Sequence, residues 1–381
     1  MELSFFKEEH EIFRESLKKF VEKEIEPYIE EWEEEREIPR SLWKKMGEMG
    51  FLCPYVEEKY GGSGVGYDYS VILIEELAKG SLGLGIATHT DIVVPYLFDY
   101  GTDEQKEKWL RKCTTGDIIM SIAMTEPDAG SDAKAIRTYA EKDGDHYIIN
   151  GQKTFITNGI ASDLIVLACK TDLNIVPASK GISLFFVETG TPGFTKGRKL
   201  DKMGMHSEDT AELYFDNCRV PKENMLGEEG EGFKYLMGEL QKERLTVTIW
   251  AQTMAERMLE DTVEYAKTKQ AFGQAIGNFQ HNAFKMAEMA TEVELGHCLL
   301  YTLIEDYLNG KDIVNRVSMA KWWIAEMANR IAYHGVQLHG GYGYMEEYPI
   351  CRFYRDVRGQ TLYAGTTEIM KLIIARNLGF R

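Results

Sequence analysis

The sequence GFKYLMGELQKERLTVTIWAQTMA, at residues 232–255, has the spacing of a long amphipathic helix. Side chains three and four positions apart share one face of a helix, and here that face carries apolar residues and one acid. A buried carboxylate without a partner costs several kcal/mol, or its pKa rises until it takes up a proton. Such a residue has either a partner or a chemical role. The face consists of Leu236, Leu240, Glu243, Val247, Trp250 and Met254.

Glu243 has a cation on each side of it in the sequence, Lys242 and Arg244. An ion pair with one of them is the simplest explanation for an acid at this position. Adjacent positions on a helix do not face each other, which weakens that explanation without removing it. The helix alone leaves both readings open, a paired acid and a functional one.

Outward from this helix, the chain divides into three zones that differ in hydrophobic period. From Gly230 onward the pattern predicts helices at 230–268, 280–309, 312–340 and 366–377. Between 117 and 227 the period changes to two in short stretches rich in β-branched and aromatic residues, which predicts antiparallel strands. The first 117 residues are again helical in pattern. We therefore expect an α+β fold with an N-terminal helical domain (1–117), a middle β domain (118–228) and a C-terminal helical domain (229–381).

Composition excludes several classes of protein. The net charge of −17 over 381 residues argues against nucleic acid as a partner. The sequence has no run of about 18 apolar residues, so we expect no membrane span. The charged N-terminus lacks the layout of a secretory signal. The six cysteines form no CxxC pair, so we expect reduced thiols, no metal site and a cytoplasmic location.

The usual cofactor and nucleophile motifs are missing from the sequence. It has no GxGxxG that opens a helix after a strand, no GxxxxGK[ST] and no GxSxG. GGSGVG at 61–66 is rich in glycine, but it joins two helical segments and reads as a loop. A nucleotide cofactor would have to be held in another way.

Several stretches of the sequence, in order along nearly the whole chain, resemble the acyl-CoA dehydrogenase family. The resemblance is greatest to the long-chain-like members of that family, because of QKERL (241–245) and YAGTTEIMK (363–371). The other stretches are IAMTEPDAGSD (122–132), INGQKTFITNG (149–159), the segment 199–233, QAFGQAIGNFQ (270–280) and QLHGGYGYMEEYPI (337–350). The resemblance implies a C-terminal four-helix bundle, FAD held between the β domain and the bundle, and a homotetramer in which a neighbouring subunit completes each FAD site.

The resemblance also implies which residues bind the cofactor. The flavin side would involve Ile122, Met124, Thr125, Ser131, Phe155 and Thr157, and the adenosine side, across the subunit interface, Phe272, Gln280, Gln337, Leu338, Gly340 and Gly341. Thr366 and Glu368 would close the site. Lys269 stands where the family commonly has an arginine that reaches the FAD pyrophosphate. Because lysine lacks the bidentate geometry of arginine, we expect weaker cofactor retention.

The resemblance assigns the chemistry to Glu243. Family members remove the α-proton of an acyl-CoA thioester with a carboxylate, while the β-hydride passes to flavin N5. Many carry this glutamate in a YEGT sequence, whereas this chain has YAGT, with Ala364 in its place. Long-chain-like and isovaleryl-like members carry it in an ERL sequence instead, which Glu243 matches. The backbone N–H of Ala364 would then bind the thioester oxygen, Gly365 would allow its close approach, and Arg244 and Ser131 would contact the CoA portion.

Asp91 is a second acid on an apolar helical stretch, LGIATHTDIVVPYLF (84–98). The matching family segment lines the acyl cavity. Asp91 is either a polar group near the cavity wall, hydrogen-bonded to Thr88 or His89, or a second base. A second base would suit a dehydrogenase of the cyclohex-1-ene-1-carboxyl-CoA type, which performs a 1,4-elimination on a ring. Those enzymes lack the α-carbon glutamate, so Glu243 weighs against this alternative.

Three functions remain in play. The first is an FAD-dependent acyl-CoA dehydrogenase that passes electrons to an electron-transferring flavoprotein. The second is an acyl-CoA oxidase, although such chains usually carry a further C-terminal helical domain beyond the point that corresponds to Arg381. The third is a catalytically silent relative, which Ala364 favours and Glu243 opposes.

Overall fold

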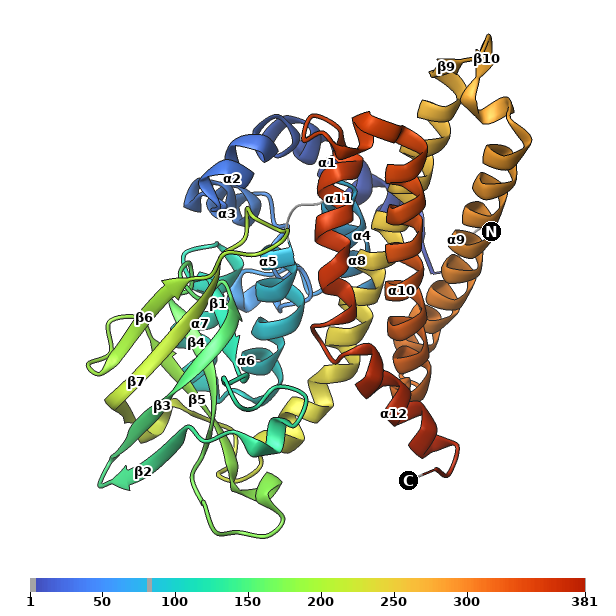
Figure 1. The fold of residues 1–381 in the computed structure, drawn as a ribbon. Helices are drawn as coiled ribbons and strands as arrows, with labels where there is room; N and C mark the ends of the chain where they lie inside the picture. The colour runs from blue at the N-terminus through green and yellow to red at the C-terminus, as the bar shows by residue number, and fades with distance from the viewer. Residues whose placement is uncertain (1–4, 81–83, 381) are drawn as a thin grey trace.

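The computed structural model describes residues 5–80 and 84–380 and has three regions along the chain (Figure 1). A group of N-terminal helices lies beside and above a β-sheet, and a set of long C-terminal helices stands on the other side of them. The α+β prediction is confirmed. None of the helices in the described part of the chain has the length and apolar character needed to cross a membrane.

The N-terminal region is helical, as the sequence predicts. A capping box begins its last helix: the Thr102 hydroxyl accepts from the Gln105 N–H (3.2 Å), and the Gln105 side chain accepts from the Thr102 N–H (3.0 Å). The helices are α1 Glu8–Glu24, α2 Ile29–Glu35, α3 Arg40–Glu48, α4 Tyr67–Lys79, α5 Leu84–Ala87, α6 Val94–Tyr100 and α7 Asp103–Thr114.

Between α5 and α6 the helix continues through a π-helical segment, Thr88–Val93. Pro95 explains why the helix widens here. In a regular α-helix the ring of a proline clashes with the carbonyl four residues earlier, which for Pro95 is that of Asp91. A turn with one extra residue relieves this contact and keeps the helix intact.

The β region forms one eight-stranded sheet in the order β6-β7-β3-β2-β4-β5-β8, with β1 beside β4. Most neighbours are antiparallel, as predicted, but β1 pairs in parallel with β4, and β2 meets β4 in parallel at one residue pair. The strands are β1 Met120–Ala123, β2 Tyr139–Asp143, β3 His146–Thr157, β4 Leu164–Lys170, β5 Ile182–Glu188, β6 Phe194–Lys199, β7 Thr210–Pro221 and β8 Met225–Leu226.

β4 and β5 are buried on both faces, which explains their unbroken apolar sequences. Leu164 and Val166 of β4 join the large core that the N-terminal and C-terminal helices share. Ile165 and Leu167 point the other way, into a smaller core within the β region. Trp109 of α7 packs on Phe186 of β5, with ring centroids 4.9 Å apart. The sheet is therefore fixed firmly to the helices on one of its faces.

The C-terminal region holds the four helices that the sequence predicts and one more, α11. α8 Gly232–Thr268 packs along α10 Val314–His339, and α9 Gln280–Leu308 packs on both. α11 Pro349–Val357 and α12 Thr367–Asn377 complete the region. A hairpin of β9 Gln270–Ala271 and β10 Gln274–Ala275 projects at the end of α8, away from the sheet (Figure 1).

Candidate active site

Glu243 lies in the interior, where α8 faces α6. The residue is 8% exposed, and its Oε1 accepts a hydrogen bond of 2.8 Å from the hydroxyl of Tyr96, which is fully buried. Its cationic neighbours turn elsewhere: Arg244 reaches the Ala364 carbonyl, and Lys242 lies over the ring of Tyr55 at 4.4 Å. The carboxylate is therefore held by a neutral hydroxyl, which leaves it available as a base.

Burial raises the pKa of Glu243 from its ordinary value of 4.5 to about 7. The hydrogen bond from Tyr96 opposes this rise, the charge of Glu239 adds to it, and the charge of Arg244 opposes it. A general base works best when its pKa lies near the operating pH, because it is then both ionised and able to hold a proton. The side chain meets this requirement at neutral pH.

The segment Ala364–Gly365 lies next to the same part of α8. The Arg244 Nε donates to the Ala364 carbonyl at 3.4 Å, and the Lys321 Nζ donates to the Gly365 carbonyl at 2.5 Å. Both residues of the segment have positive φ, +52° for Ala364 and +97° for Gly365. A positive φ is strained for alanine and persists where the surroundings fix the backbone. Hydrogen bonds from two buried side chains to successive carbonyls supply that fixation.

Thr366 and Glu368 follow directly, at the start of α12. The Thr366 side chain accepts from the Ile369 N–H at 3.3 Å and so caps the helix. Glu368 is exposed in its first turn. The helix therefore begins immediately after the two fixed carbonyls, which ties the Ala364–Gly365 segment to the C-terminal region.

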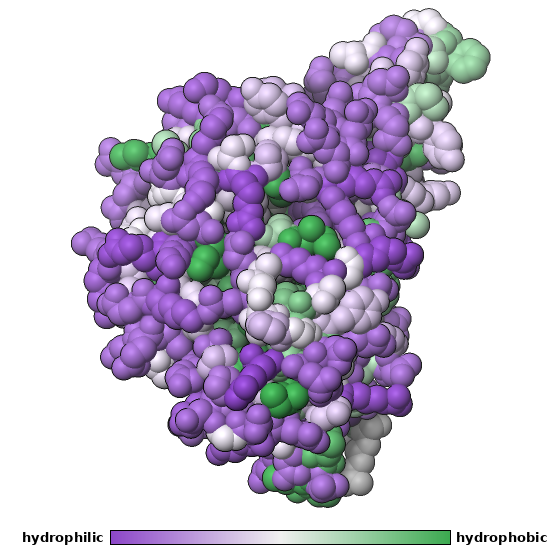
Figure 2. Space-filling view, turned by 90° about the vertical axis from the view of Figure 1, so that its left-hand side faces the viewer, coloured by the Kyte–Doolittle hydropathy of each residue, from purple (hydrophilic) through white to green (hydrophobic). Residues whose placement is uncertain are grey.

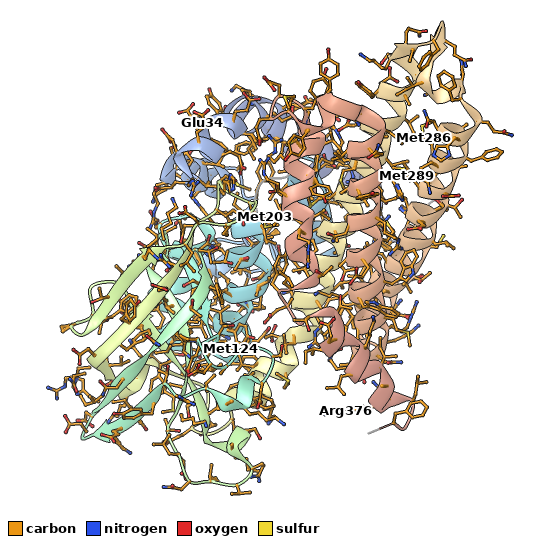
Figure 3. The ribbon with its side chains drawn as sticks, in the orientation of Figure 1. Glu34, Met124, Met203, Met286, Met289 and Arg376 are labelled. Carbon is orange, nitrogen blue, oxygen red and sulfur yellow. The ribbon has the colours of Figure 1, made fainter. Side chains whose placement is uncertain are left out.

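The flavin-side candidates come together on the β region. Figure 3 shows Met124 on the side of the sheet that faces the C-terminal helices. The β3 strand holds this segment: the Thr154 N–H donates to the Thr125 carbonyl at 3.0 Å, and the Lys153 Nζ donates to the Met124 carbonyl at 2.9 Å. Ile122 lies in β1 and is, like Met124, half-buried against the shared core.

The ammonium of Lys153 also forms a buried ion pair with Glu126 at 2.8 Å. The Glu126 carboxylate accepts in turn from the N–H groups of Arg137 and Thr138. The ammonium thus has two acceptors and each carboxylate oxygen has a donor, and such hydrogen bonds are what a buried ion pair requires in order to be stable. Residues 124–126 are in consequence rigidly joined to β3.

Phe155 and Thr157 lie further along β3, where its pairing with β7 is irregular between Lys153 and Ile156. Phe155 has a φ of +59° and is 68% exposed, so an aromatic ring stands at the surface. Thr157 is the last residue of the strand and is paired with Thr210. Ser131, also predicted here, is exposed in the loop after β1.

The adenosine-side candidates form a second group, on the C-terminal helices and not on the β region. Lys269, Leu338, Gly340 and Gly341 share a pocket of about 620 Å³, and Lys269 Nζ lies 4.7 Å from the centroid of the Tyr342 ring. The other lining residues are Tyr265, Ile276, His339, Tyr342 and Met345. A Cβ added to either glycine would meet no atom within 4 Å, so the space above this backbone is open.

Phe272, Gln280 and Gln337 are exposed around the same end of the helices. Phe272 sits in the β9–β10 hairpin with a φ of +51° and is 97% exposed. Figure 2 shows a largely hydrophilic face with apolar side chains gathered at the upper end, where the hairpin stands. Tyr342, Tyr344 and Met345 are also exposed, and a group of exposed apolar side chains is typical of a contact with another molecule.

Asp91 is fully buried in the π-helical segment. The alternative in which Asp91 bonds Thr88 or His89 is wrong, because neither carboxylate oxygen bonds either residue. The His89 ring is already engaged, since its Nδ1 accepts from the Met120 N–H at 2.9 Å and its Nε2 donates to the Cys113 carbonyl at 3.2 Å. Burial raises the pKa of Asp91 to about 6, against the opposing charge of Lys242 and a hydrogen bond from Ser70.

Three residues of the site escaped the sequence reasoning. Lys321 could have been found by the same pattern as Glu243, because it is a lone basic residue on an apolar helical face. That face of α10 also contains Val317 and Ile324. Lys153 interrupts the apolar side of β3 in a similar way. Tyr96 has no such signal, since a tyrosine on a buried helix is usual.

Family models for the acyl-CoA dehydrogenase N-terminal, middle and C-terminal domains match residues 7–117, 121–218 and 230–379. The long-chain specific acyl-CoA dehydrogenase of mouse mitochondria is 45% identical over 98% of this chain and 87% of its own. The isovaleryl-CoA dehydrogenase of Pongo abelii is 38% identical over 97% and 88%. The crystal structure of an acyl-CoA dehydrogenase from Geobacillus kaustophilus, 58% identical, superposes with a TM-score of 0.98 over 99% of both chains. With models of all three domains matched in order, the chain belongs to the acyl-CoA dehydrogenase family.

Proposed function

We propose that this protein is an FAD-dependent acyl-CoA dehydrogenase in which Glu243 removes the α-proton of the thioester. The observation that carries the proposal is the position of Glu243: a buried carboxylate with a pKa of about 7, held by Tyr96, whose neighbour Arg244 contacts the Ala364 carbonyl. The base and the candidate oxyanion-binding segment therefore meet through adjacent residues of one helix. Thioester enolisation needs both, since negative charge develops on the carbonyl oxygen as the proton leaves the adjacent α-carbon.

The residues present fit FAD. Gly340 and Gly341 border open space in a 620 Å³ pocket, and Phe155 offers an exposed ring on the β region. Thr125 and Thr157 supply hydroxyls that suit a flavin ring, and Lys269 supplies a positive charge for the pyrophosphate. When bound, FAD would accept the hydride from the β-carbon of the substrate.

The chain's own residues perform the proton chemistry. Glu243 takes the α-proton, and Tyr96 keeps its carboxylate in place while it does so. Arg244 and Lys321 bond the carbonyls of Ala364 and Gly365 and so hold the backbone that follows the Ala364 N–H, the group that would stabilise the enolate oxygen. Burial of Glu243 keeps water from competing for the proton.

The two separate groups of cofactor residues support a homo-oligomer. The group around Lys269 and Phe272 lies at the hairpin end of the bundle, whereas Met124 and Phe155 belong to the β region. We propose that each FAD bridges two subunits of a homotetramer. We further propose that an electron-transferring flavoprotein takes the electrons, as the family resemblance implies.

The proposal is tested by anaerobic bleaching of the flavin with butyryl-, octanoyl-, palmitoyl- and isovaleryl-CoA. The wild type should bleach with at least one ester, and reoxidation should be faster with electron-transferring flavoprotein than with oxygen. Glu243→Gln should bind FAD and the ester normally but bleach about 10²–10⁴-fold more slowly. Glu260→Gln, an exposed acid on the same helix, is the matched control. Full activity of Glu243→Gln would refute the assignment of the base.

Asp91 supports a second candidate, 1,4-elimination from a cyclic enoyl-CoA. Its carboxylate is fully buried and has a pKa of about 6, which suits a base. In that case Asp91→Asn abolishes bleaching by cyclohex-1-ene-1-carboxyl-CoA while Glu243→Gln retains it. Bleaching by straight-chain esters alone would exclude this candidate.

A further inference from the structure

A second buried acid, Glu239, lies one helical turn before Glu243 on α8. It is 8% exposed, and side chains four positions apart on a helix have their Cβ atoms about 5–6 Å from each other. Tyr100 lies beside Glu239, and it is one turn after Tyr96 on α6. The two tyrosine rings are 6.4 Å apart between centroids. Two tyrosine–glutamate pairs are thus stacked between α6 and α8.

The two pairs differ in their access to solvent. Glu239 lines a pocket of about 410 Å³ that Glu243 does not reach. The same pocket is lined by Asp99, Gly238, Gln241, Lys242, Tyr307, Gly310, Lys311 and Asp312. Because so many of these side chains are charged or polar, the pocket suits water. Glu239 therefore stands between the buried base and a hydrated opening.

The proposed reaction creates a need for such a position. Each turnover leaves one proton on the Glu243 carboxylate, which becomes a neutral carboxylic acid. That proton must reach solvent before Glu243 can act as a base again. The face of Glu243 that takes the proton is the one that the substrate covers, so the exit must lie elsewhere. Tyr96, bonded at 2.8 Å, is the hydrogen-bond contact that the carboxylate has within the protein.

We propose that Glu239, together with the hydroxyls of Tyr96 and Tyr100, relays this proton from Glu243 to water in the pocket. The inference rests on the proposed function. Tyr96 receives the proton of Glu243 as it passes its own toward Tyr100 and Glu239. Glu239 then releases a proton to water and returns to its carboxylate form. O–H bonds alone form and break, no electrons are transferred, and one proton leaves for each one taken from the substrate.

The charges around the two acids suit a relay. Burial raises the pKa of Glu239, as it does that of Glu243, and the charge of Asp99 adds to the rise. Lys242 opposes it, as Arg244 does for Glu243. The proton affinities of the two carboxylates are therefore shifted in the same direction. A relay needs this similarity, because a proton that one carboxylate binds far more tightly than the other is not transferred between them.

The test measures two rates separately: exchange of the Glu243 proton with solvent, and reduction of the flavin by the substrate. Holoenzyme is incubated anaerobically with palmitoyl-CoA deuterated at the α-carbon, or with butyryl-CoA if the wild type bleaches with it alone. Loss of deuterium from recovered substrate is followed by mass spectrometry, and bleaching of the flavin by stopped flow. In Glu239→Gln, deuterium washout should fall about tenfold or more, and first-turnover bleaching far less. Glu239→Asp should recover part of the washout.

Asp312→Asn is the matched control, because Asp312 is exposed on the same pocket. It should change neither rate. Wild-type washout in Glu239→Gln would overturn the relay, and so would equal losses of washout and bleaching, which would make Glu239 a residue that acts on the base itself. A wild type that bleaches with no ester would refute the proposed function instead, before any variant is compared.

Discussion

Replacing Tyr96 by phenylalanine should raise the pKa of the catalytic base and leave the rest of the site intact. The substitution removes one hydroxyl, which donates to Glu243 Oε1 at 2.8 Å, and keeps the buried ring. A hydrogen bond to a charged group contributes about 1.5–3 kcal/mol. Since one pKa unit corresponds to about 1.4 kcal/mol, the pKa of Glu243 should rise by about 1–2 units from about 7.

The consequence depends on pH in a defined way. With a pKa of about 7, half of the base is ionised at pH 7. After a rise of about 1–2 units, roughly a tenth to a hundredth is ionised, so kcat/KM at pH 7 should fall about 5–50-fold. At high pH the variant should approach the wild-type plateau, because its base is then fully ionised. The acidic limb of the pH profile is the measurement.

Tyr67→Phe is the control, because Tyr67 also bonds α8, but to the neutral hydroxyl of Thr246 at 3.0 Å. Its acidic limb should stay where the wild type has it. A loss of kcat/KM in Tyr96→Phe that is equal at every pH, or an acidic limb that does not move, would refute the claim that Tyr96 tunes Glu243. Glu239, Arg244 and Tyr100 are unchanged in both variants, so their charges cancel from the comparison.

Three further outcomes follow from the buried charges. Glu243→Gln should stabilise the fold by about 3 kcal/mol at pH 8 and hardly at pH 4. The reason is that folding raises the pKa of Glu243 from 4.5 to about 7, so the stability that the protonated side chain provides is lost as the pH rises through 7, whereas glutamine stays neutral. Asp91→Asn should likewise raise the melting temperature above pH 6, and bleaching with straight-chain esters should stay within about threefold of wild type. Lys153→Met should lower the free energy of unfolding in urea by about 3–5 kcal/mol, because Glu126 would stay buried without its cation; an unchanged midpoint would contradict this.

The helices and the central strands could be predicted from the sequence because their hydrophobic periods are strong. The helices predicted at 230–268 and 280–309 are found at Gly232–Thr268 and Gln280–Leu308. The structure adds β2 and β6, whose residues are largely exposed and carry a weak pattern, and α11, which is short. The parallel pairing of β1 with β4 could not be predicted either, because a hydrophobic pattern of period two indicates a strand but not the direction of its neighbour.

The site could be predicted in part. A lone acid on an apolar face revealed Glu243, and the same argument marked Asp91, but neither pattern names the partner of a buried charge. The hydroxyl that holds Glu243 comes from a residue 147 positions earlier in the chain. One of the two interpretations of Asp91 has it bond Thr88 or His89 in its own helix, and in the widened turn before Pro95 it bonds neither. The hydrogen-bond partners of buried acids depend on long-range packing and on local helix geometry, and the hydrophobic period of the sequence predicts neither.

The π-helical segment Thr88–Val93 has a consequence for how the chain can vary in length. A π-turn is equivalent to one residue inserted into an α-helix. Removal of one residue from the segment, with Pro95 replaced, would allow a regular helix without displacing α7 or the sheet beyond it. Tyr96 and Asp91 would then stand at different angles around the helix axis. A single-codon deletion here, combined with replacement of Pro95, would thus rearrange the wall facing Glu243 while it leaves the fold in place.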